Sequence, residues 1–78
     1  MGRKRGRAVI RLRVQEVAKA KGMTQAGLSR KSDVDIKTLR EIFHDPTRNI
    51  TLDVLNRLAN GLEVDARELI DYTPDSKR

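Results

Sequence analysis

The stretch Thr24–Phe43, TQAGLSRKSDVDIKTLREIF, carries the pattern that decides the fold of this 78-residue chain. Its apolar and small residues recur at the spacing that packs two short helices against each other across a tight turn. Asp35 can cap the second helix, because its carboxylate can accept the free backbone N–H groups of the first turn. The pattern predicts helices over about residues 24–32 and 36–44, with an inward face of Ala26, Leu28, Ser29, Val34, Leu39 and Ile42.

The face of the 36–44 helix that is left over is polar and mostly basic. Lys and Arg side chains can donate to guanine or to phosphate, Glu can accept from cytosine, and an apolar side chain can touch a thymine methyl group. A helix with such a face can lie in the major groove of DNA. The alternatives are a solvated charged surface, an ion pair between Lys37 and Glu41, and a position for Ile36 at the edge of the core. The residues concerned are Ile36, Lys37, Arg40, Glu41 and His44.

The spacing of the apolar, capping and basic residues in Thr24–Phe43 resembles the helix-turn-helix of the Cro/C1-type (Xre) family of DNA-binding transcriptional regulators. The resemblance runs from about Val14 to Leu69. It implies a compact, all-α, five-helix domain of the λ-repressor kind that binds double-stranded DNA sequence-specifically, as a repressor and as a homodimer. The matching residues are Gly22, Met23, Thr24, Gln25, Leu28, Val34, Thr38, Leu39, Ile42, Leu52, Leu55, Leu58, Leu62, Val64 and Leu69.

The resemblance also implies which residues of the expected DNA-binding surface contact bases and which contact the DNA backbone. The start of the 36–44 helix is the part that reads bases in this family, and the first turn of the 24–32 helix and the loop after residue 44 lie at the DNA backbone. This implies that bases are read by Ile36, Lys37, Arg40 and Glu41, and that the backbone is held by Gln25, Thr38, His44, Arg48 and Asn49. A basic arm can enter an adjacent minor groove or follow the phosphates, and it consists of Arg3, Lys4, Arg5 and Arg7.

Some positions depart from the family pattern. Asp33 and Glu63 stand where the family often has Gly, at sites expected to have positive φ. Because Glu tolerates that conformation less well than Asp, the helix before it is expected to end early, near Asn60 and Gly61. Ala18 and Phe43 replace a frequent Arg–Glu ion pair, so a small apolar contact is expected there instead.

The rest of the chain divides into a disordered basic arm (1–7), one helix-turn-helix domain (8–73) and a frayed tail (74–78). Further helices are expected over 14–21, after a cap at Thr51, and after a capping box at Asp65–Glu68. Val9–Val14 alternates apolar and basic residues, which slightly favours a short strand over an early helical turn. The partner of such a strand is either Leu69–Tyr72 of the same chain or the same strand of a second chain.

Composition supports a polyanionic partner and excludes several other classes. Lys and Arg number 17 against 11 Asp and Glu, a net charge of +6, although many small basic domains are merely soluble. The chain has no Cys, one His and no Gly-rich phosphate loop or nucleophile motif, so we expect no metal, no cofactor and no enzymatic activity. No apolar run is long enough to span a bilayer, and no secretory signal is present, so a cytoplasmic, nucleoid-associated protein is expected.

Two other functions stay open at this point. One is an interaction module, antitoxin-like or bridging, for which DNA binding is secondary. The other is binding to RNA or to nucleic acid without sequence preference, which one Tyr and one Phe support poorly because stacking on single strands needs aromatic side chains. No residues are left for an effector domain, so we expect no small-molecule effector.

Overall fold

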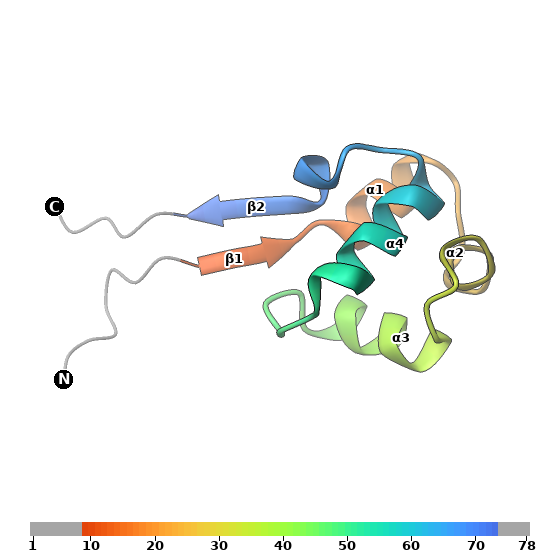
Figure 1. Cartoon of the computed structure of the whole chain (residues 1–78), viewed down its shortest axis with the longest axis horizontal. Coiled ribbons are helices and arrows are strands. Elements are labelled where there is room, and N and C mark those ends of the chain that lie inside the picture. Colours follow the sequence, from red (N-terminus) through yellow and green to blue (C-terminus); the bar gives the residue numbers. More distant parts are fainter. Residues whose placement is uncertain (1–8, 74–78) are drawn as a thin grey trace, which may run out of the picture.

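The computed structural model describes residues 9–73, in which four helices pack beside a two-stranded antiparallel sheet (Figure 1). The expectations for residues 1–7 and 74–78 lie outside the described residues. In chain order the elements are β1 (Val9–Leu12), α1 (Val14–Ala20), α2 (Gln25–Ser32), α3 (Ile36–His44), α4 (Leu52–Leu62), the 3-10 turn η1 (Ala66–Leu69) and β2 (Ile70–Thr73). None of these helices is long and apolar enough to cross a membrane.

Side chains just before three of the helices satisfy backbone N–H groups of the first turn. The Thr24 hydroxyl accepts from the N–H of Gly27 at 3.0 Å, and the Thr51 hydroxyl accepts from the N–H of Val54 at 3.1 Å. Asp35 accepts from the N–H of Lys37 at 3.3 Å, which confirms the predicted cap of α3. These caps fix where α2, α3 and α4 begin.

The left-handed residues at the ends of α2 and α4 are Asp33 (φ 60°) and Glu63 (φ 59°). The expectation that α4 ends near Asn60 and Gly61 is wrong, since the helix continues to Leu62. Leu62 is buried in the core, and the N–H of Val64 donates to the carbonyl of Ala59 at 3.0 Å, which closes the last turn. Tertiary burial on both sides of Glu63 holds it in a conformation that its side chain disfavours.

The two-stranded sheet corrects the all-α, five-helix expectation. β1 pairs antiparallel with β2, so the alternating segment is a strand whose partner lies in the same chain. Asp65 accepts from the N–H of Arg67 at 2.9 Å, yet the predicted fifth helix is only the short turn η1. The N–H of Arg13 donates to the carbonyl of Leu69 at 2.7 Å, so the chain is already paired with the segment before α1 at the point where η1 ends and β2 begins.

The core lies among α1, α2, α3, α4 and η1, and the helix-turn-helix pattern supplies much of it. Ala26 of the predicted inward face is exposed, whereas Ser32, outside that pattern, is buried. The Ser32 hydroxyl donates to the carbonyl of Leu28 at 2.6 Å, and the Ser29 hydroxyl donates to the carbonyl of Val34 at 2.7 Å. The largest fully buried side chains are Val14, Leu28, Leu39, Ile42, Leu58, Leu62 and Leu69, with Ala18 also buried and Phe43 packed against them.

Candidate nucleic-acid interface

Helix α3 presents the predicted base-reading residues on its outer face. Its inner face is anchored by Leu39 and Ile42, which are fully buried. Lys37, Arg40 and Glu41 are exposed, while Ile36 is half-buried at the first position of the helix. The remaining predicted contacts on this helix are Thr38, which is half-buried, and His44, which is exposed at the last position. The helix is therefore held from beneath with its polar side open.

Lys37 and Arg40 are the two basic side chains on this face, and their N–H groups make no ion pair among residues 9–73. By contrast, Arg13 pairs with Glu16 at 2.7 Å, and Arg57 pairs with an acidic residue of its own helix at 2.9 Å. Unpaired donors on an anchored helix are available to an anionic ligand.

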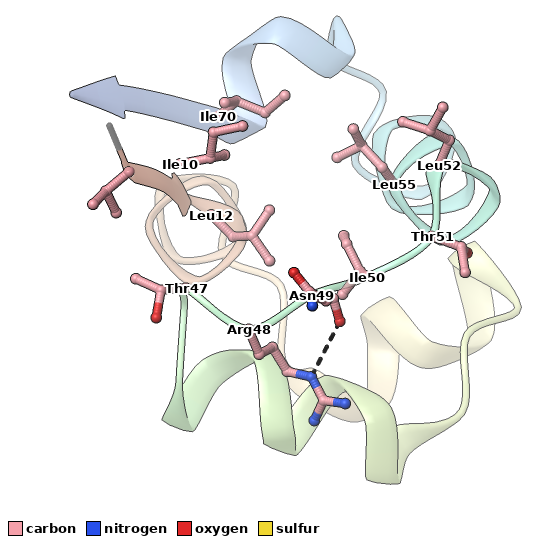
Figure 2. Close-up of a pocket in the computed structure, with 11 residues that line it drawn as sticks. Ile10, Leu12, Thr47, Arg48, Asn49, Ile50, Thr51, Leu52, Leu55 and Ile70 are labelled. Atoms are coloured by element: carbon pink, nitrogen blue, oxygen red, sulfur yellow. Dashed lines mark hydrogen bonds between the residues drawn. The ribbon is translucent and has the colours of Figure 1, made fainter. Parts of the chain in front are cut away.

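Glu41 lies in an ion pair with Arg48, which follows α3 in the loop to α4. The local pair between Lys37 and Glu41 that the sequence allowed is not formed. The Arg48 Nε also donates to the carbonyl of Asn49 at 3.5 Å, as the dashed line in Figure 2 marks. The structure thus joins two of the predicted site residues, one from the base-reading set and one from the backbone set.

The loop that carries Arg48 and Asn49 is anchored by contacts that the sequence analysis missed. Asp45 accepts from the N–H of Thr47 at 3.2 Å and from its hydroxyl at 2.9 Å, and the N–H of Leu12 donates to the carbonyl of Pro46 at 2.7 Å. The order Asp-Pro-Thr was the available signal, since Asp followed by Pro is typical of a tight turn. The loop is consequently fixed both by its own turn and by β1.

Helix α2 begins beside this surface with Gln25 as its first residue, half-buried. Its first turn contains no acidic side chain, so the positive end of the helix dipole is not neutralised. At its other end, Asp33 is contacted by Arg57 of α4, whose Nη1 donates to the Asp33 carboxylate and carbonyl, each at 3.1 Å. This contact between α2 and α4 was also missed, because no local pattern relates residues 24 positions apart.

Within residues 9–73 no cluster of three or more potential metal ligands exists. The basic and amide side chains among the predicted residues lie on α3, the following loop and the start of α2, and they present hydrogen-bond donors. Such a surface can bind an extended anion by many separate contacts.

Comparison with known proteins identifies the family. Residues 13–75 match the family model of the Cro/C1-type HTH DNA-binding domain. No curated protein sequence matches the chain significantly. Among solved structures, an alanine mutant of the restriction-modification controller protein C.Esp1396I is 33% identical, with a TM-score of 0.64 and 70% of each chain covered.

A second similar structure is the restriction-modification controller protein C.AhdI from Aeromonas hydrophila, which is 30% identical with a TM-score of 0.63. The match covers 72% of this chain and 83% of that chain. The family model spans nearly all of the described residues, including the whole helix-turn-helix. The chain therefore belongs to the Cro/C1-type helix-turn-helix family and is a DNA-binding transcriptional regulator.

Proposed function

We propose that α3 enters the major groove and reads base edges with Ile36, Lys37, Arg40 and Glu41. The observation that carries this proposal is the pair of exposed basic side chains, Lys37 and Arg40, that lack acidic partners within residues 9–73 on a helix otherwise anchored in the core. Ile36 is half-buried, so only part of its side chain is available to a thymine methyl group. Only Oε1 of Glu41 accepts from Arg48, which leaves its other oxygen able to accept from cytosine.

In the same proposal the DNA backbone is held from three places around α3. These are the start of α2, the ends of α3 and the anchored loop, and they contribute Gln25, Thr38, His44, Arg48 and Asn49. The basic residues Arg3, Lys4, Arg5 and Arg7 add contacts to the backbone or an adjacent minor groove. The Arg48 guanidinium, oriented by Glu41, keeps further N–H groups for a phosphate oxygen.

We further propose that the chain acts as a homodimeric repressor in the cytoplasm, associated with the nucleoid and without a small-molecule effector. A single reading helix specifies only a few base pairs, and two such helices about 34 Å apart read half-sites in successive turns of the major groove. Bound dimers repress by occupying a promoter. The controllers of restriction-modification systems among the similar structures support a role in transcription.

Selection of bound duplexes from a random pool tests this function. The expected result is a two-fold symmetric consensus. Wild-type protein is expected to bind a duplex with this consensus more tightly than any duplex that differs from it at one base pair. The Lys19→Ala variant is expected to select the same consensus as wild type. It loses one exposed basic side chain, as a change on α3 would, but Lys19 lies on α1 and not on the proposed reading helix. A pool that yields no consensus with wild-type protein contradicts sequence-specific binding.

A further inference from the structure

The turn between α2 and α3, residues 33–35, sets the direction in which α3 leaves α2. Side chains from outside the turn hold two of its backbone carbonyls. The Ser29 hydroxyl donates to the carbonyl of Val34 at 2.7 Å, and Nη1 of Arg57 donates to the carbonyl of Asp33 at 3.1 Å. Ser29 belongs to α2 itself, whereas Arg57 lies on α4, so the second contact ties the turn to a different part of the domain.

The guanidinium of Arg57 makes three hydrogen bonds. Nη1 donates to the carboxylate of Asp33 as well as to its carbonyl, each at 3.1 Å, and Nε donates to Asp53 at 2.9 Å. Asp53 lies one helical turn before Arg57 on α4. Because the guanidinium is planar, donors on two of its edges fix its orientation, and the bond to Asp53 directs it toward the turn.

The same face of α4 contacts the end of α2 a second time. Gly61 lies one helical turn after Arg57, and a Cβ added at Gly61 would lie 2.8 Å from the Cβ of Ser32. This backbone packing places α4 against the last residue of α2, and Arg57 reaches the residue that follows it. Two contacts from one face of α4 therefore hold the beginning of the turn.

An aspartate is a strained residue at this position. The φ of Asp33 is 60°, in the left-handed region that glycine adopts without strain. Glycine would keep the carbonyl that Arg57 binds but would lack the carboxylate. The Asp33 side chain is 94% exposed, so its ion pair adds little stability, and what the carboxylate provides is a second fixed point for Arg57 on the turn.

We propose that Arg57 is a positioning residue for base reading, which acts through Asp33 to fix the angle at which α3 leaves the turn. The inference rests on the proposed function, because it concerns the helix proposed to read bases. The path from Asp33 to that helix is short, since Asp35 accepts from the N–H of Lys37 at 3.3 Å. A side chain that reads a base edge must be held to within about 0.5 Å, so a small rotation of α3 changes which bases are preferred. In this role Arg57 acts through α3 and binds no phosphate itself.

Affinities for the consensus duplex and its single-base variants, measured well below the unfolding temperature of every protein, test this role. Arg57→Gln is expected to reduce the preference about three- to tenfold at the positions that Lys37→Ala relaxes, with an unchanged salt slope. Arg57→Lys is expected to restore little, because an ammonium cannot present two donor edges to two aspartates. Arg67→Gln is the matched control, since Arg67 is another exposed arginine paired with a nearby aspartate, on η1, and its loss is expected to leave preference unchanged.

A second pair of variants separates positioning from stability. Asp33→Gly and Glu63→Gly each place glycine at a left-handed residue, so neither is expected to lose stability. Asp33→Gly alone removes the carboxylate that Arg57 binds, and it is expected to relax preference at the same positions as Arg57→Gln. Glu63→Gly is expected to keep the wild-type preference. Arg57→Gln is expected to cost less preference in the Asp33→Gly protein than in wild type, because the two changes break the same contact.

The outcomes distinguish this inference from the proposed function. A wild-type preference in Arg57→Gln, or an equal loss in Arg67→Gln, overturns the positioning role while the consensus of the wild-type protein stands. A salt slope shallower by about 0.9 in Arg57→Gln would assign Arg57 to a phosphate and also overturns it. If wild-type protein selects no consensus, the proposed function fails, and hydrogen exchange of the free protein then tests the hold of Arg57 on α3. The N–H of Leu39, which donates to the carbonyl of Asp35 at 3.1 Å, is expected to exchange faster in Arg57→Gln than in Arg67→Gln, and equal rates overturn the inference.

Discussion

Arg48 and Glu41 form an ion pair that joins the loop after α3 to the exposed face of that helix. Their side chains are partly exposed, so the pair itself adds little to stability. Its consequence is orientation: the guanidinium is held beside the reading helix, and the loop beneath it is held by Asp45 and Pro46. In the proposed function, this one ion pair would couple base reading to backbone binding.

This coupling gives the first prediction. Arg48→Ala is expected to weaken binding evenly across duplexes, because phosphates carry no base identity. In a Glu41→Gln background the same change is expected to cost less, since the guanidinium is already released. Affinities of the four proteins at one salt concentration measure the coupling. An equal reduction of affinity in both backgrounds would mean that Glu41 does not orient Arg48.

The second prediction concerns the exposed start of α3. Lys37→Ala is expected to relax preference at defined operator positions by about 1–3 kcal/mol, the worth of a good contact to a base edge. Ile36→Ala is expected to relax preference at a neighbouring position, by less, because Ile36 is half-buried. The measurement is affinity for the consensus and each single-base variant, with Lys19→Ala as control. If either change scales all duplexes by one factor, that residue does not read bases.

The third prediction concerns the left-handed residues. Glu63→Gly is expected to stabilise the fold by about 0.5–1 kcal/mol, because glycine adopts φ near 59° without the strain that Glu carries. Asp33→Gly is expected to gain less, since Asp tolerates this conformation better and the substitution removes the carboxylate that Arg57 binds. Urea denaturation compares the two variants. If Asp33→Gly has a larger free energy of unfolding than Glu63→Gly, the expected order of stabilities is wrong.

The fourth prediction concerns a close approach of α2 and α4 at Gly61 and Ser32. A Cβ added at Gly61 would lie 2.8 Å from the Cβ of Ser32 and 2.9 Å from its backbone. Gly61→Ala is therefore expected to destabilise the fold by about 1–3 kcal/mol, although alanine normally favours a helix. Gly27→Ala is the matched control, because its nearest neighbour lies at 3.3 Å in a side chain. Equal stabilities of the two variants would contradict the close packing.

The fifth prediction rests on the sequence of the basic arm. Deleting residues 1–7 removes Arg3, Lys4, Arg5 and Arg7 and is expected to weaken binding to all duplexes. For every phosphate that the shortened protein no longer neutralises, the slope of log affinity against log salt becomes shallower by about 0.9. Titrations at several salt concentrations give the slope, and circular dichroism serves as the folding control. An unchanged slope would place the arm away from DNA.

The local sequence determined the helix-turn-helix itself. The bounds of α2 and α3, the Asp35 cap and the burial of Leu28, Leu39 and Ile42 follow from apolar spacing and from short-range hydrogen bonds, which operate within a few residues. The exposed position of Lys37 and Arg40 follows in turn, because a helix buried on one face must present the other. For this reason the sequence alone was enough to predict the fold family and to single out α3 as the helix proposed to read bases.

Contacts between distant residues decided the rest. Only the tertiary structure chose β2 of the same chain as the partner of β1, reduced the fifth helix to η1 and carried α4 through to Leu62. It also paired Glu41 with Arg48 rather than with Lys37, and left Ile10 and Leu52 facing one groove. Each outcome depends on which of several locally acceptable partners is brought near by packing, and local spacing does not contain that information.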